Sequence, residues 1–167
     1  MIALLAHLYA VAVIGTFLAV LPYFTILVAG FNPIGSGQKS RLLLQLVGFV
    51  LGAGGGALSY SCMMLFITRG KGTAFPTDPP RRFVVLGPYR YVRNPMYIGN
   101  LCLATGIGLI IASWTYLLYT LALAIVTHCY IVISEEPRLR TRFGTEYEGY
   151  RVNVRRWLPK KQPYIAP

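Results

Sequence analysis

Charged residues are absent from most of this sequence. Asp, Glu, Lys and Arg make up 13% of its 167 residues, and none of them occurs in residues 1–38, 42–68 or 94–134. The chain is also 55% hydrophobic, with a mean hydropathy of +0.54, which is more apolar surface than one small soluble domain can bury. The pattern excludes an ordinary soluble protein and predicts membrane spans separated by ionic loops.

The lengths of the uncharged segments predict four spans. A hydrocarbon core of roughly 30 Å takes about 20 helical residues, so the first two segments provide one span each and the 41-residue third provides two. We place the turn in the third segment near Ala112-Ser113-Trp114-Thr115, where small polar residues meet an interfacial Trp. Pro22 is expected to kink the first span or to end it. The predicted fold is all-α, a single integral membrane helical bundle over residues 1–167, with spans at about 2–29, 42–68, 95–112 and 114–134, a cytoplasmic loop at 69–94 and a C-terminal amphipathic helix at about 137–156.

Basic residues are unevenly distributed between the loops. Lys39 and Arg41 lie between the first two spans, whereas 14 of the 16 Lys and Arg lie in the second loop and the C-terminal tail. The positive-inside rule therefore predicts a multi-pass protein with both termini cytoplasmic, in the inner membrane if the cell is bacterial. The net charge of +11 is then explained by topology and by attraction to anionic lipid head groups. No nucleic-acid-binding motif accompanies the charge, so we expect no nucleic-acid partner.

Cysteine is scarce, and small residues are concentrated in one span. The cysteines all fall in predicted spans without CxxC spacing, which indicates neither a disulfide framework nor a metal site. They are Cys62, Cys102 and Cys129. Gly48, Gly52 and Gly56 recur at four-residue intervals on one helix face. Because they lie in mid-membrane and follow no strand, they predict close helix packing rather than a phosphate-binding loop.

Two adjacent carboxylates follow the last predicted span. Glu135 and Glu136 lie at the membrane edge, where desolvating both charges is costly unless one is protonated or a cation balances them. An interhelical salt bridge and a bound cationic ligand such as S-adenosylmethionine both fit. The candidate protein partners are Arg90, Arg93 and Arg138.

A histidine inside the last span is a second candidate for chemistry. His128 precedes Glu135 by seven residues, so on a continuous helix it shares that face and lies roughly 10 Å deeper. It is either a functional imidazole beneath the carboxylates or a neutral structural side chain. His7 has no matching partner, and we expect it to be structural.

The segment after the acidic pair has helical periodicity. Pro137 prevents simple continuation of the span and suits the first turn of a new helix. Apolar residues then recur at steps of three and four with arginines largely outside the stripe, which predicts an amphipathic helix on the membrane surface or under the loop. The stripe consists of Leu139, Phe143, Tyr147, Tyr150, Val154 and Leu158.

These motifs carry a resemblance to a known superfamily. Arg93-Asn94-Pro95-Met96-Tyr97-Ile98-Gly99, the later Glu135-Glu136 pair and the run from Phe143 to Tyr150 resemble the membrane methyltransferases of the isoprenylcysteine carboxyl methyltransferase and phospholipid methyltransferase superfamily, over about residues 70–159. Asn94 stands where the superfamily motif has His, in the form associated with phosphatidylethanolamine methyltransferases. Its amide does not titrate, so the resemblance implies a positioning role for Asn94.

The resemblance implies S-adenosylmethionine as cofactor and a lipid or lipid-like methyl acceptor. Phospholipid amines, prenylcysteine-type carboxylates, small thiols and other hydrophobic molecules all remain possible acceptors. An amine must lose a proton, for which Glu135 or His128 is the candidate base. The implied cofactor-binding residues are Arg82, Phe83, Val84, Tyr89, Arg93, Asn94, Pro95, Met96, Tyr97, Glu135 and Glu136. The alternative from another class is a small transporter or membrane scaffold, which is disfavoured because no carboxylate lies deep within a predicted span.

Overall fold

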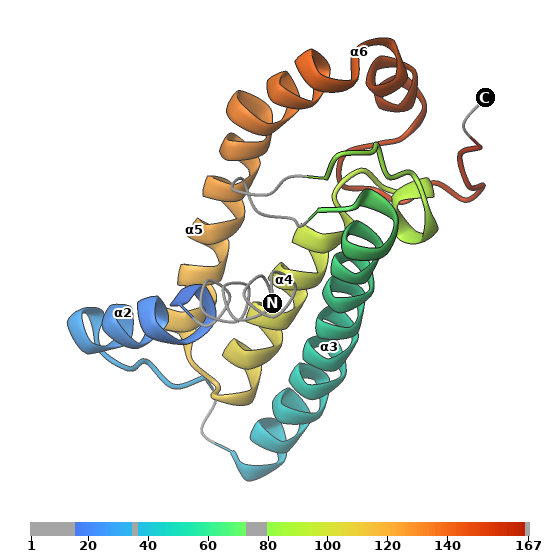
Figure 1. Ribbon diagram of the computed structural model, residues 1–167. Helices are drawn as coiled ribbons and strands as arrows, with labels where there is room; N and C mark the ends of the chain where they lie inside the picture. The colour runs from blue at the N-terminus through green and yellow to red at the C-terminus, as the bar shows by residue number, and fades with distance from the viewer. Residues whose placement is uncertain (1–15, 35–36, 73–79, 166–167) are drawn as a thin grey trace. The chain divides into compact units, whose positions relative to one another are not determined.

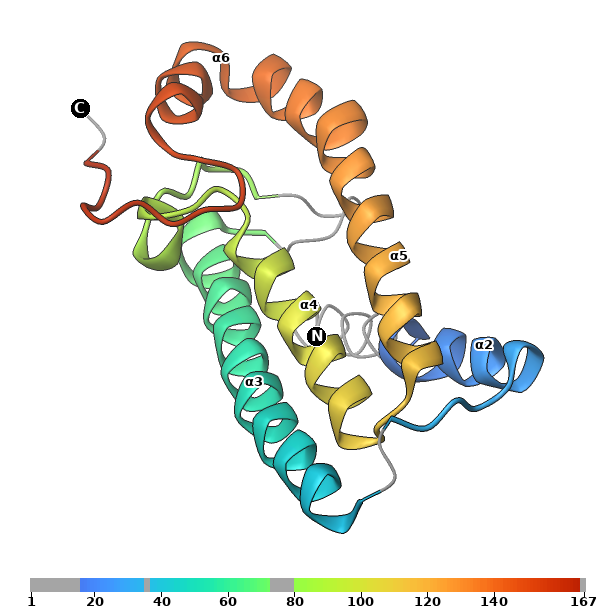
Figure 2. The same cartoon turned by 180° about the vertical axis from the view of Figure 1, so that it is seen from behind.

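A computed structural model describes residues 16–34, 37–72 and 80–165, and their regular structure is helical (Figures 1 and 2). The first part of predicted span 1, including His7, lies outside the described residues. The described elements are η1 Thr16–Val20, α2 Leu21–Ala29, α3 Gln38–Leu65, η2 Phe66–Gly70, η3 Gly87–Arg90, α4 Pro95–Ile110, α5 Trp114–Tyr130, η4 Ile131–Glu135 and α6 Glu136–Asn153. The all-α prediction is confirmed for this part of the chain.

Two continuous helices are long and apolar enough to cross a membrane. One joins α3 to η2 over Gln38–Gly70, and the other joins α5, η4 and α6 over Trp114–Asn153. The apolar helices Leu18–Ala29 and Pro95–Ile110 are shorter. By length and composition, the described residues thus provide two spanning helices where the sequence predicted four spans.

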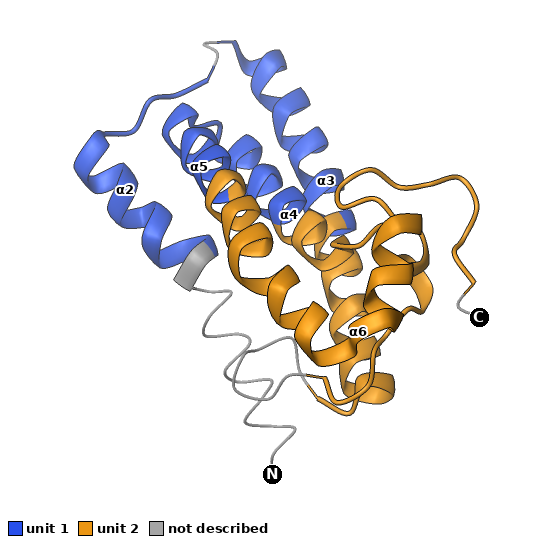
Figure 3. Ribbon diagram, turned by 90° about the horizontal axis from the view of Figure 1, so that it is seen from above, with its two compact units in different colours: residues 1–54, 101–123 blue, residues 55–100, 124–167 orange. Residues whose placement is uncertain are grey.

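The chain divides into two compact units, shown in different colours in Figure 3. Unit 1 comprises residues 1–54 and 101–123, and unit 2 comprises residues 55–100 and 124–167. In unit 1, glycines bring α3 and α4 together: a Cβ added at Gly106 would lie 2.5 Å from the Gly48 carbonyl oxygen and 2.6 Å from the Gly52 nitrogen. The helix-packing interpretation of the Gly48 and Gly52 stripe is therefore confirmed.

The turn between α4 and α5 also belongs to unit 1. Helix α4 ends at Ile110, Ala112 has a φ of +49°, and α5 begins at Trp114. The Trp114 N–H donates to the Asn32 carbonyl at 2.9 Å, which fixes the first turn of α5 against the segment that follows α2. The chain thus reverses at the small polar residues that the sequence singled out.

The helix continues past Pro137, which lies in the first turn of α6, the position that its ring was expected to suit. A proline ring clashes with the carbonyl four residues earlier, here Ile133, which lies in the π-helical turn η4. The wider π turn accommodates this clash, so α6 follows directly from Glu136 to Asn153. The break comes instead at Gly144, whose φ of 50° and ψ of −124° are not helical and suit a residue without a Cβ. In the structure the segment predicted as a helix at about 137–156 is α6, which is kinked at Gly144 and ends at Asn153.

The part of α6 beyond the kink forms the core of unit 2. Tyr147 and Tyr150 are buried there together with Val154, the residue that follows α6. Phe83, from the loop between η2 and η3, packs against them. The Phe83 ring centroid lies 5.3 Å from that of Tyr150 and 5.8 Å from that of Tyr147. Leu158, the last residue of the predicted stripe, lies after the helix and is 63% exposed. The loop is therefore held by the aromatic face of α6.

The chain after α6 runs back along the segment that precedes α4. Three backbone hydrogen bonds fasten it: from the Arg93 N–H to the Arg155 carbonyl (2.9 Å), from the Lys160 N–H to the Tyr91 carbonyl (3.0 Å) and from the Tyr164 N–H to the Arg90 carbonyl (2.9 Å). Residues 90–93 are thus bound along their length by residues 155–164.

Candidate functional site

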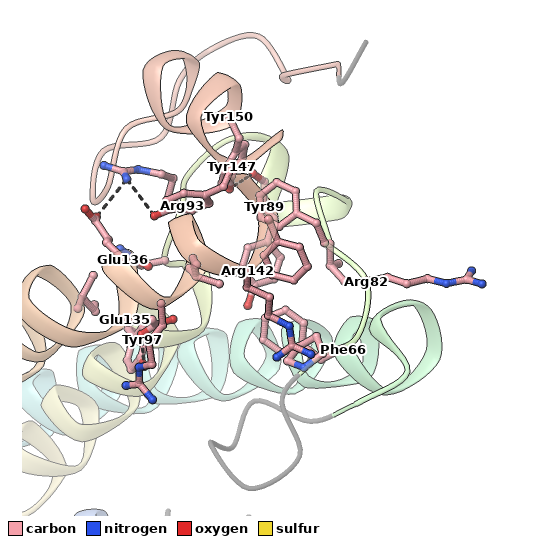
Figure 4. A pocket seen from close by; sticks show the side chains of 18 of the residues that line it. Phe66, Arg82, Tyr89, Arg93, Tyr97, Glu135, Glu136, Arg142, Tyr147 and Tyr150 are labelled. Carbon is pink, nitrogen blue, oxygen red and sulfur yellow. Dashed lines mark hydrogen bonds and ion pairs between the residues drawn. The ribbon is translucent and has the colours of Figure 1, made fainter. Parts of the chain in front are cut away.

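Unit 2 contains a cavity of about 280 Å³ (Figure 4). Its walls come from the end of the long α3–η2 helix, the loop after residue 80, the first turn of α4, and the η4–α6 region. The lining residues are Phe66, Pro80, Arg82, Phe83, Val84, Tyr89, Arg93, Asn94, Tyr97, Tyr130, Ile131, Glu135, Glu136, Arg138, Leu139, Arg142, Phe143, Tyr147 and Tyr150.

The start of α4 carries one wall of the cavity. Pro95 is the first residue of this helix, a position that suits proline because its missing N–H is not needed there. Tyr97 follows in the first turn, and its hydroxyl donates a hydrogen bond to Glu135 Oε2 at 2.7 Å. Behind it, Ser59 Oγ lies 3.1 Å from the Met96 carbonyl and 2.8 Å from Asn100 Oδ1. These contacts fix the first turn of α4 on α3.

The two adjacent carboxylates have different environments, and Glu136 is saturated by arginines. Glu136 is 6% exposed, and it accepts hydrogen bonds from Arg93 Nη1 at 3.0 Å, Arg156 Nε at 2.7 Å and Arg156 Nη2 at 3.0 Å. Burial alone would raise the pKa of Glu136, but the hydrogen bond from Arg156 and the charges of Arg93, Arg156 and Arg140 outweigh it and lower this pKa. Glu136 is therefore a structural anion.

Glu135 keeps its capacity to bind a cation. It lies one residue beyond the predicted span 114–134, and among the described residues no Lys or Arg forms an ion pair with it; its hydrogen-bond donor is Tyr97. Burial raises the pKa of Glu135 above its ordinary value, and the charge of Glu136 adds to this, while the Tyr97 hydrogen bond and the charge of Arg138 partly oppose it. A carboxylate in a cavity wall without an ion pair among the described residues suits a cationic ligand.

Two arginines in the cavity wall have N–H groups that bind no carboxylate of the described residues. Arg93 Nε is buried and has no hydrogen-bond partner among the described atoms. Arg142 is exposed, its guanidinium lies 5.5 Å from the Phe143 ring centroid, and no carboxylate of the described residues pairs with it. Figure 4 shows its guanidinium directed towards Phe66. The site therefore offers donors for an anionic or hydroxyl group as well as Glu135 for a cation.

Aromatic rings form the apolar part of the cavity. Phe66 and Tyr89 have ring centroids 5.1 Å apart, and Phe83 and Phe143 are equally close at 5.1 Å. The Tyr150 hydroxyl donates to the Tyr89 carbonyl at 2.6 Å, which fixes the 3₁₀ turn η3 that carries Tyr89. Such rings suit a flat, partly apolar ligand group.

A sequence model of a family described as phospholipid methyltransferase matches residues 43–146. The chain belongs to the phospholipid methyltransferase family. The match includes the Arg93 to Gly99 motif and the Glu135-Glu136 pair, so the resemblance inferred from these residues is confirmed. No curated protein and no solved structure matches the chain. Membership in the phospholipid methyltransferase family implies methyl transfer to a lipid.

The cavity of this phospholipid methyltransferase family member contains most of the predicted cofactor-binding residues. All of them except Pro95 and Met96 line it; Met96 instead offers its backbone carbonyl to Ser59. Arg82 lines the cavity, but Figure 4 shows its guanidinium extending away from the other labelled side chains.

His128 does not lie beneath the carboxylates. It is exposed and outside the cavity lining, and its Nδ1 accepts a hydrogen bond from Trp157 Nε1 at 3.0 Å. The π turn Ile131–Glu135 separates His128 from Glu135. Because a π turn holds more residues than an α turn, residues seven apart no longer share a face. The contact with Trp157 fits the alternative of a structural, hydrogen-bonded histidine, and the role of His128 as a base stays a prediction.

Several lining residues were missed as site residues, although some had a signal. Phe143, Tyr147 and Tyr150 belong to the apolar stripe of the predicted amphipathic helix, and the structure places all three in the wall. Arg142 lies beside that stripe. Arg156, which holds Glu136, had no local signal because the two residues are 20 positions apart.

Proposed function

We propose that this protein transfers a methyl group from S-adenosylmethionine to a membrane-embedded lipid or lipid-like acceptor. The observation that carries this proposal is the half-buried Glu135 carboxylate, which has no ion pair among the described residues and lines the same cavity as Arg93 Nε, a buried donor with no described partner. A zwitterionic cofactor with a cationic sulfonium and ammonium, a carboxylate and a ribose diol has the groups that such a cavity needs.

The lining residues fit this cofactor by their chemistry. Glu135 would hold a cationic group, Arg93 Nε and Arg142 would donate to the carboxylate or to hydroxyl oxygens, and the rings of Phe66 and Tyr89 would cover the base. When bound, S-adenosylmethionine supplies a methyl group on a positive sulfur. The protein contributes alignment and exclusion of water, which is sufficient when the leaving group is neutral.

An acceptor amine must lose a proton, and we propose Glu135 as the group that takes it. Its raised pKa brings its basicity closer to that needed for proton transfer near neutral pH. Asn94 cannot serve as a base; its Nδ2 donates to the Arg156 carbonyl at 3.3 Å, which supports a positioning role. Carboxylate and thiolate acceptors need no such base.

We also propose that the predicted spans at about 2–29 and 95–112, which include α2 and α4, cross the membrane together with the two longer helices, in a four-span arrangement with both termini cytoplasmic. Support comes from the apolar composition of these shorter helices and from the 14 basic residues in the second loop and tail. In this arrangement a soluble cofactor reaches the cavity from the cytosol, and an amphipathic acceptor reaches it from the bilayer.

Replacing Glu135 by Gln tests the proposed function. We expect the purified protein in detergent to bind S-adenosylhomocysteine saturably, and the Glu135→Gln variant to bind it at least tenfold more weakly. The reason is that a charge-assisted contact from this carboxylate to the ammonium, the cation that S-adenosylhomocysteine retains, contributes about 1.5–3 kcal/mol. Isothermal titration calorimetry measures this. Glu146→Gln is the matched control, since Glu146 is exposed and outside the cavity lining. Absence of saturable binding to the wild-type protein, or equal affinities for all three proteins, contradicts the proposal.

The same binding should depend on pH through Glu135. Only the ionised form of Glu135 attracts a cation, and its pKa lies above the ordinary value of 4.5. Affinity is therefore expected to be full at high pH and to fall as the pH drops through this raised pKa, earlier than for an ordinary glutamate. Titrations at a series of values between about pH 5 and pH 8 measure the midpoint. The Glu135→Gln variant should not lose affinity in this way as the pH drops. If its affinity falls with the same midpoint as that of the wild type, the pH dependence belongs to a group other than Glu135.

A further inference from the structure

Two residues beyond α6 connect both walls of the cavity. The backbone carbonyl of Arg156 accepts the hydrogen bond from Asn94 Nδ2 on the α4 side. The Arg156 guanidinium binds both carboxylate oxygens of Glu136 on the α6 side, at 2.7 and 3.0 Å. Trp157 adds a hydrogen bond to His128 on α5. We call Arg156 and Trp157 the clasp.

Within this pair, Arg156 determines how Arg93 is held in the cavity wall. Arg156 Nε and Arg93 Nη1 share the same Glu136 oxygen, so Glu136 holds Arg93 while Arg156 holds Glu136. Arg93 in turn lies in the cavity wall with its unpartnered Nε. A bidentate guanidinium fixes a carboxylate in orientation as well as in charge, so the position of Arg93 depends on Arg156.

Arg156 also affects the ionisation of Glu135. The groups that shift the pKa of Glu135 are Tyr97, Arg138 and Glu136, and the Tyr89 and Tyr147 hydroxyls also face its charge. Glu136 disfavours ionisation of its neighbour, and Arg156 is one of the arginines that offset the Glu136 charge. Without Arg156, the Glu136 carboxylate would act on Glu135 with less compensation.

We propose that Arg156 is a positioning residue for the cofactor cavity: through Glu136 it orients Arg93 and preserves Glu135 as an ionised cation-binding group. The inference rests on the proposed function, and it concerns a residue beyond the segment 43–146 that matches the family. Arg156 is outside the cavity lining, so it acts through its neighbours rather than by contact with the ligand.

The test compares Arg156→Gln with Arg155→Gln, the same change at the adjacent position. Arg155 is exposed, its side chain has no partner among the described residues, and the substitution leaves its backbone carbonyl in place. We expect Arg156→Gln to bind S-adenosylhomocysteine about tenfold more weakly than the wild type, as loss of one charge-assisted pair predicts. We also expect the midpoint of its loss of affinity in acid to move to higher pH, because a cation has been removed and Glu136 is less compensated. Arg155→Gln should match the wild type in both measurements.

Arg156→Lys separates positioning from folding. A lysine keeps the charge but not the two-point geometry, so we expect an intermediate loss of affinity with a smaller change of the midpoint. This variant decides the question if thermal unfolding shows that Arg156→Gln does not fold. Wild-type affinity and midpoint in Arg156→Gln, or in Arg156→Lys when the glutamine variant is unfolded, would overturn the positioning role. If the wild-type protein itself does not bind S-adenosylhomocysteine, the proposed function fails, which is a different result.

Discussion

Replacing Glu136 by Gln should reduce the free energy of unfolding by about 3–5 kcal/mol, the usual cost of removing one partner from a buried ion pair. The Glu136 side chain is 8% exposed and that of Arg93 is 10% exposed. A glutamine keeps the shape but leaves the Arg93 charge buried without a counter-charge, and Arg156 loses both of its carboxylate contacts. Denaturant titration of the protein in detergent micelles, followed by circular dichroism, measures the effect.

Glu148→Gln is the matched control for this prediction. Glu148 also pairs with two arginines, Arg140 and Arg151, each at 2.9 Å, but its side chain is 41% exposed. Exposed pairs contribute about 0–1 kcal/mol, so the control should cost much less. Equal costs for the two substitutions would show that burial does not govern the Glu136 network.

The Glu136 contribution should also disappear in acid. Its pKa is lowered in the folded protein, so the stability that it provides is fully present above the ordinary glutamate pKa. It is lost as the pH falls through the lowered value. The dependence of unfolding free energy on acid pH should therefore be shallower in Glu136→Gln than in the wild type.

Replacing Gly106 by Ala should destabilise unit 1 by about 1–3 kcal/mol, the range observed for overpacking. The added Cβ would lie 2.5 Å from the Gly48 carbonyl oxygen and 2.6 Å from the Gly52 nitrogen. Both are backbone atoms of α3, so no side-chain rotation relieves the contact, and the two helices must move apart. The same unfolding titration measures the cost.

Gly54→Ala is the matched control in the same packed pair of helices. A Cβ at Gly54 meets nothing within 4 Å, and alanine is a better helix former than glycine by about 1 kcal/mol. The control should therefore be neutral or stabilising. If Gly106→Ala is as stable as Gly54→Ala, α3 and α4 do not approach each other at these glycines.

The sequence predicts the helices better than their details, and the reason is the range of the interactions involved. Hydropathy identifies α3, α4 and α5 because apolar residues occur along the whole length of each helix. The π turn Ile131–Glu135 and the non-helical Gly144 depend on small differences in backbone free energy within a few residues, which hydropathy does not record. The π turn rotates Glu135 relative to α5, which is why His128 lies on Trp157 rather than beneath Glu135.

The family motifs predict which residues form the site but not which partners each of the two carboxylates has. Glu135 and Glu136 are chemically identical neighbours in the sequence, and consecutive helix positions point in different directions. One meets Tyr97, whereas the other meets Arg93 and Arg156. The Arg156 contact spans 20 residues, beyond the reach of any helical periodicity, so only the folded chain reveals which carboxylate is free.

The fastening of residues 90–93 by the returning chain has a consequence for the order of events during synthesis. The two helices that are long and apolar enough to cross a membrane begin at Gln38 and Trp114, so their apolar parts are made before residues 155–164. The hydrogen bonds from residues 155–164, and the Arg156 contacts to Glu136, form only after that stretch has left the ribosome. The apolar helices are therefore made before the cavity wall is complete, and a nascent chain that stops at Asn153 lacks the contacts that hold residues 90–93 and Glu136.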